Sequence, residues 1–142
     1  KCEFEAHITC HDEDIFSCGG EKVEGPSVCV CVRYDGKEFL GYGKDYLWTD
    51  AFADLQKKLP FNVKILCCLT CRHGNMCPIG SIPGELFSTK DVMITQKSDL
   101  FFYTENQTER INRSHDCTDV CESYQEQTKE YFTYNDYPFC FE

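Results

Sequence analysis

The chain has 142 residues, the length of one domain, and about 68–70% of its unfolded surface should be buried on folding. Hydrophobic residues make up 42% and charged residues 27%, so long disordered stretches are not expected. No apolar run reaches the ~18 residues of a membrane-spanning helix. The formal net charge of −10 argues against nucleic acid and membrane as partners and favours a basic protein partner.

Alternation of apolar and polar residues predicts strands in the first part of the chain. The expected strands cover residues 2–10, 15–18, 27–34 and 37–42. Asp35 and Gly36 separate the last two of these strands, and this pair favours the positive φ angles of a two-residue hairpin turn. The sequence therefore predicts a small antiparallel sheet.

One helix is expected to follow that sheet. Residues 50–59 have helical periodicity, with Thr49 or Asp50 as the cap and Pro60 as the stop. Residues 61–65 alternate again and predict one more strand. The expected fold is α+β, an antiparallel β-meander with one main helix at about residues 50–59 and a cysteine-rich, loop-rich C-terminal half.

The second half of the chain has weaker patterns. We expect a single domain over residues 1–142, with a sheet-and-helix scaffold at 1–66 and a cysteine-rich return segment at 67–142. Within the return segment the expected elements are a strand at 85–88, a strand or buried turn at 98–104, a helix at 105–113 and a turn at 118–124.

The strongest candidate for chemistry is the cysteine-rich stretch of residues 67–78. Cys68 and Cys71 have the two-residue spacing of a knuckle, a tight turn that aims two sulfurs at one metal ion. Cys77 follows in the same loop, and the fourth ligand must come from a distant part of the chain. Cys121 is the first choice, so the expected metal ligands are Cys68, Cys71, Cys77 and Cys121.

Several alternatives for this stretch stay open. Cys117 is a second choice for the distant ligand, and His73 is a substitute for one thiolate. Four thiolates at about 2.3 Å make a closed structural zinc site. An iron–sulfur cluster is the alternative occupant, because Cys77-Pro78 matches the end of ferredoxin motifs. Disulfides or free thiols would also account for these cysteines.

No enzyme is expected. Catalytic Cys–His pairs meet by folding rather than by adjacency, so the neighbours Cys71 and His73 are no evidence for one. The chain has no Gly-rich phosphate loop, no H-E-x-x-H and no G-x-S-x-G. The scattered His7, His11 and His115 are interpreted as surface histidines.

Part of the chain resembles a family of small uncharacterised bacterial cysteine-rich proteins, with the pattern C-x2-C-x5-C-P, then C-E-x-Y, then Y-N-D. The residues that carry the resemblance are 68–80, 101–105, 121–124 and 134–136, and they span about half of the chain. Such proteins often have a cysteine just before Thr-Lys-Asp, where this chain has Ser88. The resemblance implies a reducing cytoplasm, whereas the sequons at residues 106–108 and 112–114 would matter only in a secreted protein.

Small acidic bacterial proteins of this style often look like immunity partners of secreted toxins. We therefore expect a non-enzymatic protein-binding module, immunity-like, whose acidic and aromatic surface recognises a basic protein. One alternative is a structural protein that binds zinc or an iron–sulfur cluster. A second alternative is a secreted protein with a framework of disulfides among its twelve cysteines.

Overall fold

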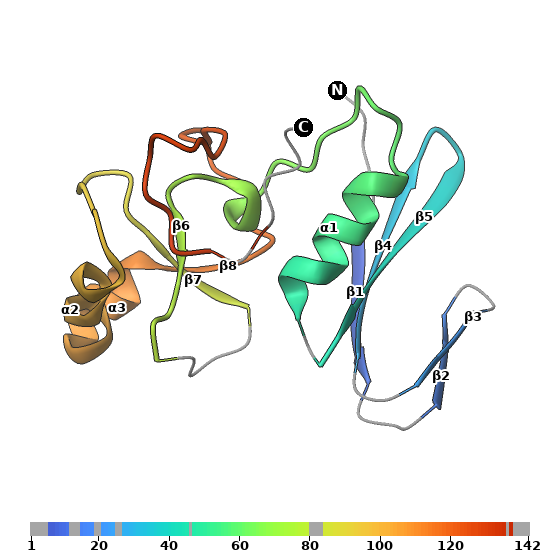
Figure 1. Ribbon diagram of the computed structural model, residues 1–142, viewed down its shortest axis with the longest axis horizontal. Helices are drawn as coiled ribbons and strands as arrows, with labels where there is room; N and C mark the ends of the chain where they lie inside the picture. Colours follow the sequence, from blue (N-terminus) through green and yellow to red (C-terminus); the bar gives the residue numbers. More distant parts are fainter. Residues whose placement is uncertain are drawn as a thin grey trace. The chain divides into compact units, whose positions relative to one another are not determined.

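The computed structural model describes residues 6–11, 15–18, 21–24, 27–45, 47–79, 84–135 and 137 (Figure 1). It divides the chain into two compact units, residues 1–64 and 65–142. The division falls close to the one expected after residue 66, and a single domain stays a prediction. The α+β class is confirmed. Among the described residues, no helix combines the length and the apolar character needed to cross a bilayer.

The first unit contains a three-stranded antiparallel sheet in the order β1-β4-β5. Its strands are β1 (Ala6–His11), β4 (Ser27–Tyr34) and β5 (Lys37–Lys44). The turn after β4 has φ angles of 51° at Asp35 and 70° at Gly36, which confirms the expected hairpin. The first residues of the strand expected at 2–10 lie outside the described residues.

A second hairpin in this unit joins β2 (Ile15–Cys18) to β3 (Glu21–Glu24). The first of these strands was expected. The second strand was not expected, because its sequence has one apolar residue, Val23, among three charged residues and so does not alternate.

Helix α1 (Trp48–Lys58) packs against β4 and β5 (Figure 1). Its buried face includes Phe52 and Leu55, as the periodicity indicates. The close approach depends on Gly41 of β5, because a Cβ atom there would overlap the backbone oxygen of Ala51 and the side chain of Leu55. Glycine is therefore required at that contact.

Two expectations about the flanks of α1 were wrong. The helix begins two residues early, its N-cap is Leu47, and no side chain caps it, so neither Thr49 nor Asp50 has that role. Residues 61–65 form a turn and irregular chain instead of a strand. Among the described residues no strand pairs with this segment, and alternation stabilises a strand only next to a neighbouring strand and a core. Phe61 is accordingly fully exposed, at 100%.

The second unit is built on another antiparallel sheet, in the order β6-β7-β8. These strands are short: β6 (Gly74–Met76), β7 (Glu85–Ser88) and β8 (Ser114–Asp116). The strand expected at 85–88 is confirmed as the central one. Two 3₁₀ turns complete the regular structure with two short helices: η1 (Cys68–Thr70), η2 (Lys97–Leu100), α2 (Phe101–Glu105) and α3 (Gln107–Arg113).

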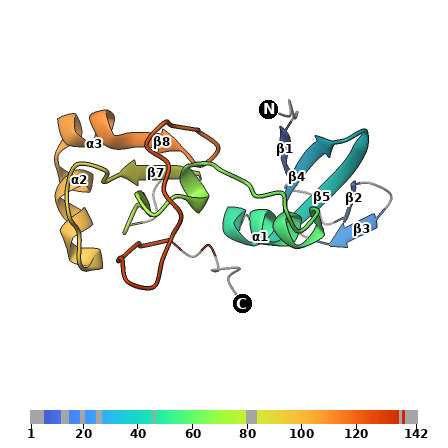
Figure 2. The same cartoon turned by 90° about the horizontal axis from the view of Figure 1, so that it is seen from above.

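Helices α2 and α3 lie side by side at one end of this sheet (Figure 2). The helix expected at 105–113 is confirmed, whereas the strand or buried turn expected at 98–104 is wrong, because η2 and α2 occupy those residues. Short apolar runs do not distinguish a strand from a helix by periodicity alone.

The two faces of β7 point to different environments. Phe87 is fully buried in a cluster with Leu100 and Tyr103 from the helical side of the unit. Glu85 lies on the same face as Phe87 and makes a 2.7 Å ion pair with Arg110 of α3. The opposite face presents Leu86 and Ser88, because successive side chains of a strand alternate. That opposite face borders the cysteine loop.

Candidate metal centre

The cysteine loop is shaped by hydrogen bonds at its start. The Cys67 sulfur accepts a bond from the backbone N–H of Thr70, and the Thr70 hydroxyl accepts one of 3.2 Å from the backbone N–H of Cys67. This reciprocal pair closes the η1 turn. A backbone N–H of this turn therefore bonds to the Cys67 sulfur.

Gly74 makes the sharp return of this loop possible. A Cβ atom at this position would overlap the backbone carbonyl of Cys68. The Gly74 N–H also donates a 3.0 Å bond to the Cys71 carbonyl. The loop therefore closes on itself around Cys68 and Cys71, and β6 starts directly after it.

The return segment lies against this loop along its backbone. The Cys68 N–H donates a 2.7 Å bond to the carbonyl of Asp119, and the Leu69 N–H donates a 3.0 Å bond to the carbonyl of Cys117. An antiparallel bridge joins Cys71 to Glu126. These contacts bring the neighbourhood of Cys121 to the knuckle, as expected from the sequence.

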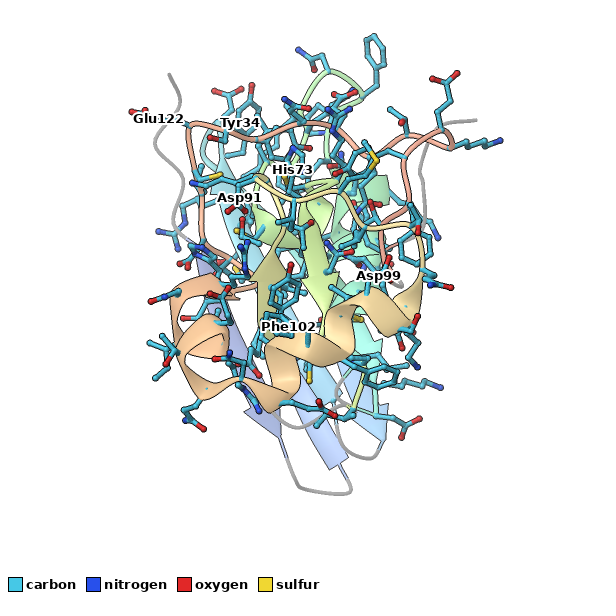
Figure 3. The ribbon with its side chains drawn as sticks, turned by 90° about the vertical axis from the view of Figure 1, so that its left-hand side faces the viewer. Tyr34, His73, Asp91, Asp99, Phe102 and Glu122 are labelled. Carbon is cyan, nitrogen blue, oxygen red and sulfur yellow. The ribbon has the colours of Figure 1, made fainter. Side chains whose placement is uncertain are left out.

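A small cavity lies between the loop, the return segment and the sheet. Its volume is about 10 Å³, roughly the space of one water-sized sphere. The wall includes three thiols, two imidazoles, two hydroxyls and one lysine side chain, which belong to Cys68, Cys71, Cys121, His73, His115, Ser88, Ser123 and Lys90. In Figure 3, the labelled His73 lies toward the end of the unit opposite to Phe102 of α2.

Three of the four expected ligands line this cavity, and the fourth lies elsewhere. Cys77 belongs to the hydrophobic cluster around Phe87, on the other face of β7. The alternative ligand Cys117 is buried, and its neighbours include Cys67 and Cys68. The structure therefore brings Cys68, Cys71 and Cys121 together without Cys77.

The thiols oppose each other's ionisation. Burial, followed by the charges of Cys121 and Asp119, raises the pKa of Cys68 to about 12. Burial and the charge of Cys67 raise the pKa of Cys117 to about 12 as well. Without a cation these two thiols are protonated at neutral pH, which makes them poor nucleophiles.

The two imidazoles of the cavity wall are held differently. His115 places its Nδ1 atom 3.3 Å from Oδ2 of Asp119. The Nδ1 atom of His73 is buried and has no hydrogen-bond partner among the described residues. Burial and the charge of Arg72 lower the pKa of His73, so its ring is neutral at pH 7 and able to coordinate a metal. The His73 ring packs edge-on against Tyr131, at 5.6 Å between centroids.

The donors surround the cavity but do not yet converge. Within the described ranges, no three Cys, His, Asp or Glu side chains already stand in a metal-binding arrangement. Rotation of the thiols about χ1 would be needed to draw their sulfurs inward. His115 and Ser88 were missed as neighbours of the cysteines, although the spacing His115, Asp119, Cys121 in one short segment was a usable signal.

Comparison with known proteins assigns no family to this arrangement. No family model, no curated protein and no solved structure matches the chain.

Proposed function

We propose that the 65–142 unit binds one zinc ion through Cys68, Cys71 and Cys121, and that the ion fastens the return segment to the cysteine loop. The observation that supports this proposal is the shared cavity lined by these three thiols. Zinc prefers thiolate and imidazole ligands, and structural zinc sites have four protein ligands with no open coordination position. In this proposal the role of the ion is structural rather than catalytic.

Zinc binding at this site would be coupled to loss of the Cys68 proton. The Cys68 thiol loses its proton only above neutral pH, because burial and nearby negative charge raise its pKa to about 12. A divalent cation in the cavity reverses this effect, since it attracts the thiolates that otherwise repel one another. Metal binding and local order in this unit are then coupled.

Equilibrium dialysis of the reduced protein against zinc tests the proposal. The wild type should retain about one zinc ion per chain, and Cys71→Ser should bind it at least about tenfold more weakly. Cys29→Ser is the matched control, because Cys29 is a buried cysteine of the other unit. A wild type that retains no zinc overturns the proposal, as does an iron–sulfur chromophore in freshly purified protein.

A second function, recognition of a basic protein, is favoured by the exposed acidic part of the return segment. Residues 116–130 contain a single basic residue, Lys129. Their exposed carboxylates are Asp116, Asp119, Glu122, Glu126 and Glu130, and Glu122 lies at the edge of the unit in Figure 3. We propose that this segment, held in place by the zinc ion, attracts a positively charged partner in the manner of an immunity protein.

Binding to an immobilised decalysine peptide tests this second function. Retention should fall between about 0.01 M and about 0.15 M salt, as the Debye length shortens from about 30 Å to about 8 Å. The double variant Glu122→Lys, Glu126→Lys should lose retention at low salt. The double variant Asp50→Lys, Glu105→Lys has the same net charge and should keep it, and equal loss in both variants contradicts a local surface.

A further inference from the structure

We propose that His115 is the fourth ligand of the zinc ion, through its Nε2 atom, and that Asp119 orients it. This inference rests on the proposed zinc site and completes it as a Cys3His centre. The histidine was interpreted as a surface residue from the sequence, and only the folded chain places it with the cysteines.

The pairing of β7 and β8 sets the position of His115. Leu86 is directly opposite His115 in the register of these strands. Opposite residues of an antiparallel pair share one face, and so do residues two apart along a strand. His115, Leu86 and Ser88 therefore lie on the same face of the sheet, and all three line the cavity.

Asp119 fixes the direction of the imidazole. Its Oδ2 atom lies 3.3 Å from Nδ1 of His115 and also accepts a 3.1 Å bond from the N–H of Asp116. Because a carboxylate only accepts, Nδ1 carries the proton in this contact and Nε2 keeps its lone pair. Metal-bound histidines almost always have such a partner on the other nitrogen.

Asp119 also connects the histidine to a cysteine of the site. Its backbone carbonyl accepts the 2.7 Å bond from the N–H of Cys68. One residue thus holds both a sulfur donor and an imidazole donor beside the same cavity. On binding, the thiols of Cys68, Cys71 and Cys121 would release their protons to solvent, and His115 would coordinate through the lone pair of Nε2.

The other polar side chains of the wall, Ser88, Ser123, Lys90 and His73, fit the fourth position less well. Ser88 offers a neutral hydroxyl, which is not among the usual ligands of zinc. His73 is the stronger rival, because its Nδ1 atom is buried without a partner among the described residues. Its ring, however, takes its orientation from Gln125 and Tyr131, with no carboxylate to set the tautomer.

Cobalt substitution tests the assignment. The Co²⁺ protein should show sulfur-to-metal charge-transfer bands and the visible bands of tetrahedral Co²⁺. His115→Gln should shift the visible bands, keep the charge-transfer bands and weaken Co²⁺ binding at least about tenfold. Asp119→Asn should weaken binding about 10–100-fold, and His73→Gln is the matched control that should change neither spectrum nor affinity.

The outcomes separate the two proposals. A wild type that binds neither Co²⁺ nor Zn²⁺ overturns the zinc site itself. If the wild type binds the metal but the visible bands move in His73→Gln, only the role of His115 is overturned. The same holds if the bands move in neither histidine variant. Nitrogen NMR of the wild-type zinc protein needs no variant, so it does not depend on whether the variants fold. It should show His115 with a metal-bound Nε2 and a protonated Nδ1. Absence of that signature contradicts the assignment.

Discussion

The Oδ2 atom of Asp119 lies 3.3 Å from Nδ1 of His115, and the backbone carbonyl of Asp119 accepts the N–H of Cys68 at 2.7 Å. These two contacts join the end of β8 to the cysteine loop. The return segment is therefore attached to the knuckle by backbone and side chain before any metal is considered. In our account a zinc ion adds the strongest connection at the same place.

Gly74→Ala should destabilise the cysteine loop. The new methyl group would overlap the carbonyl of Cys68, so the loop has to open. We expect the free energy of unfolding to fall by about 1–3 kcal/mol, measured by urea unfolding followed by circular dichroism. Gly36→Asn is the control, because nothing lies within 4 Å of a Cβ atom there and asparagine tolerates its φ of 70°. Equal losses in both variants would contradict the close approach.

Arg110→Met should lower the free energy of unfolding, because it leaves the buried carboxylate of Glu85 with only the Ser114 hydroxyl of these two donors. The Glu85 side chain is only 6% exposed in this pair. Glu85→Leu combined with Arg110→Met should recover most of the loss, as measured by a double-mutant cycle. Arg33→Met is the control, since its pair with Glu38 is exposed and should contribute at most about 1 kcal/mol. If Arg33→Met lowers the free energy of unfolding as much as Arg110→Met does, burial of the Glu85–Arg110 pair has no special effect.

Cys77→Ala should leave zinc binding unchanged. The Cys77 thiol packs in the hydrophobic cluster with Phe87, away from the cavity that holds the other candidate ligands. We expect dialysis to give the wild-type zinc content and unfolding to show a loss of about 1 kcal/mol for the removed buried volume. Loss of zinc in this variant would restore the ligand set expected from the sequence.

Phe61→Ser should change the free energy of unfolding by no more than about 0.5 kcal/mol. Its ring is fully exposed, at 100%, because residues 61–65 do not form a strand. Phe87→Ala should cost about 3–5 kcal/mol, since Phe87 is fully buried. Thermal unfolding of the two variants makes the comparison, and a large effect at Phe61 would argue for a buried strand there.

The carboxyl of Asp91 should titrate below its ordinary value of 3.8, chiefly because the Arg113 side chain holds its pKa down. The stability that this pair contributes is present above the unfolded pKa and is lost as pH falls through the lowered value. The carboxylate is exposed, so the effect is small. Carbon NMR should show the titration midpoint rising in Arg113→Met, whereas that of Asp99, held down mainly by the Thr95 N–H, should not move. An unchanged Asp91 midpoint would exclude Arg113 as the cause.

Local signals in the sequence were sufficient for the first unit. The hairpin at Asp35 and Gly36 was predictable because the turn residues themselves determine its φ angles. The face of α1 with Phe52 and Leu55 was predictable from periodicity. The strand expected at 61–65 was wrong because no strand in the described part of the chain pairs with it, which the local sequence does not reveal.

The candidate site was predictable only in part. Cys68 and Cys71 share one tight loop, so their spacing was informative. Cys77 lies in the hydrophobic cluster and His115 lies at the cavity because the strand register puts them on opposite faces of the sheet, and the sequence does not show that register. The spacing of cysteines in the sequence does not predict this strand register.

Native mass spectrometry of freshly purified, chelator-free protein decides whether a zinc ion joins the return segment to the cysteine loop. The account predicts a folded species heavier than the reduced polypeptide by one zinc ion, which is lost on denaturation and is absent from Cys121→Ser. A folded wild type with the mass of the bare polypeptide would contradict it.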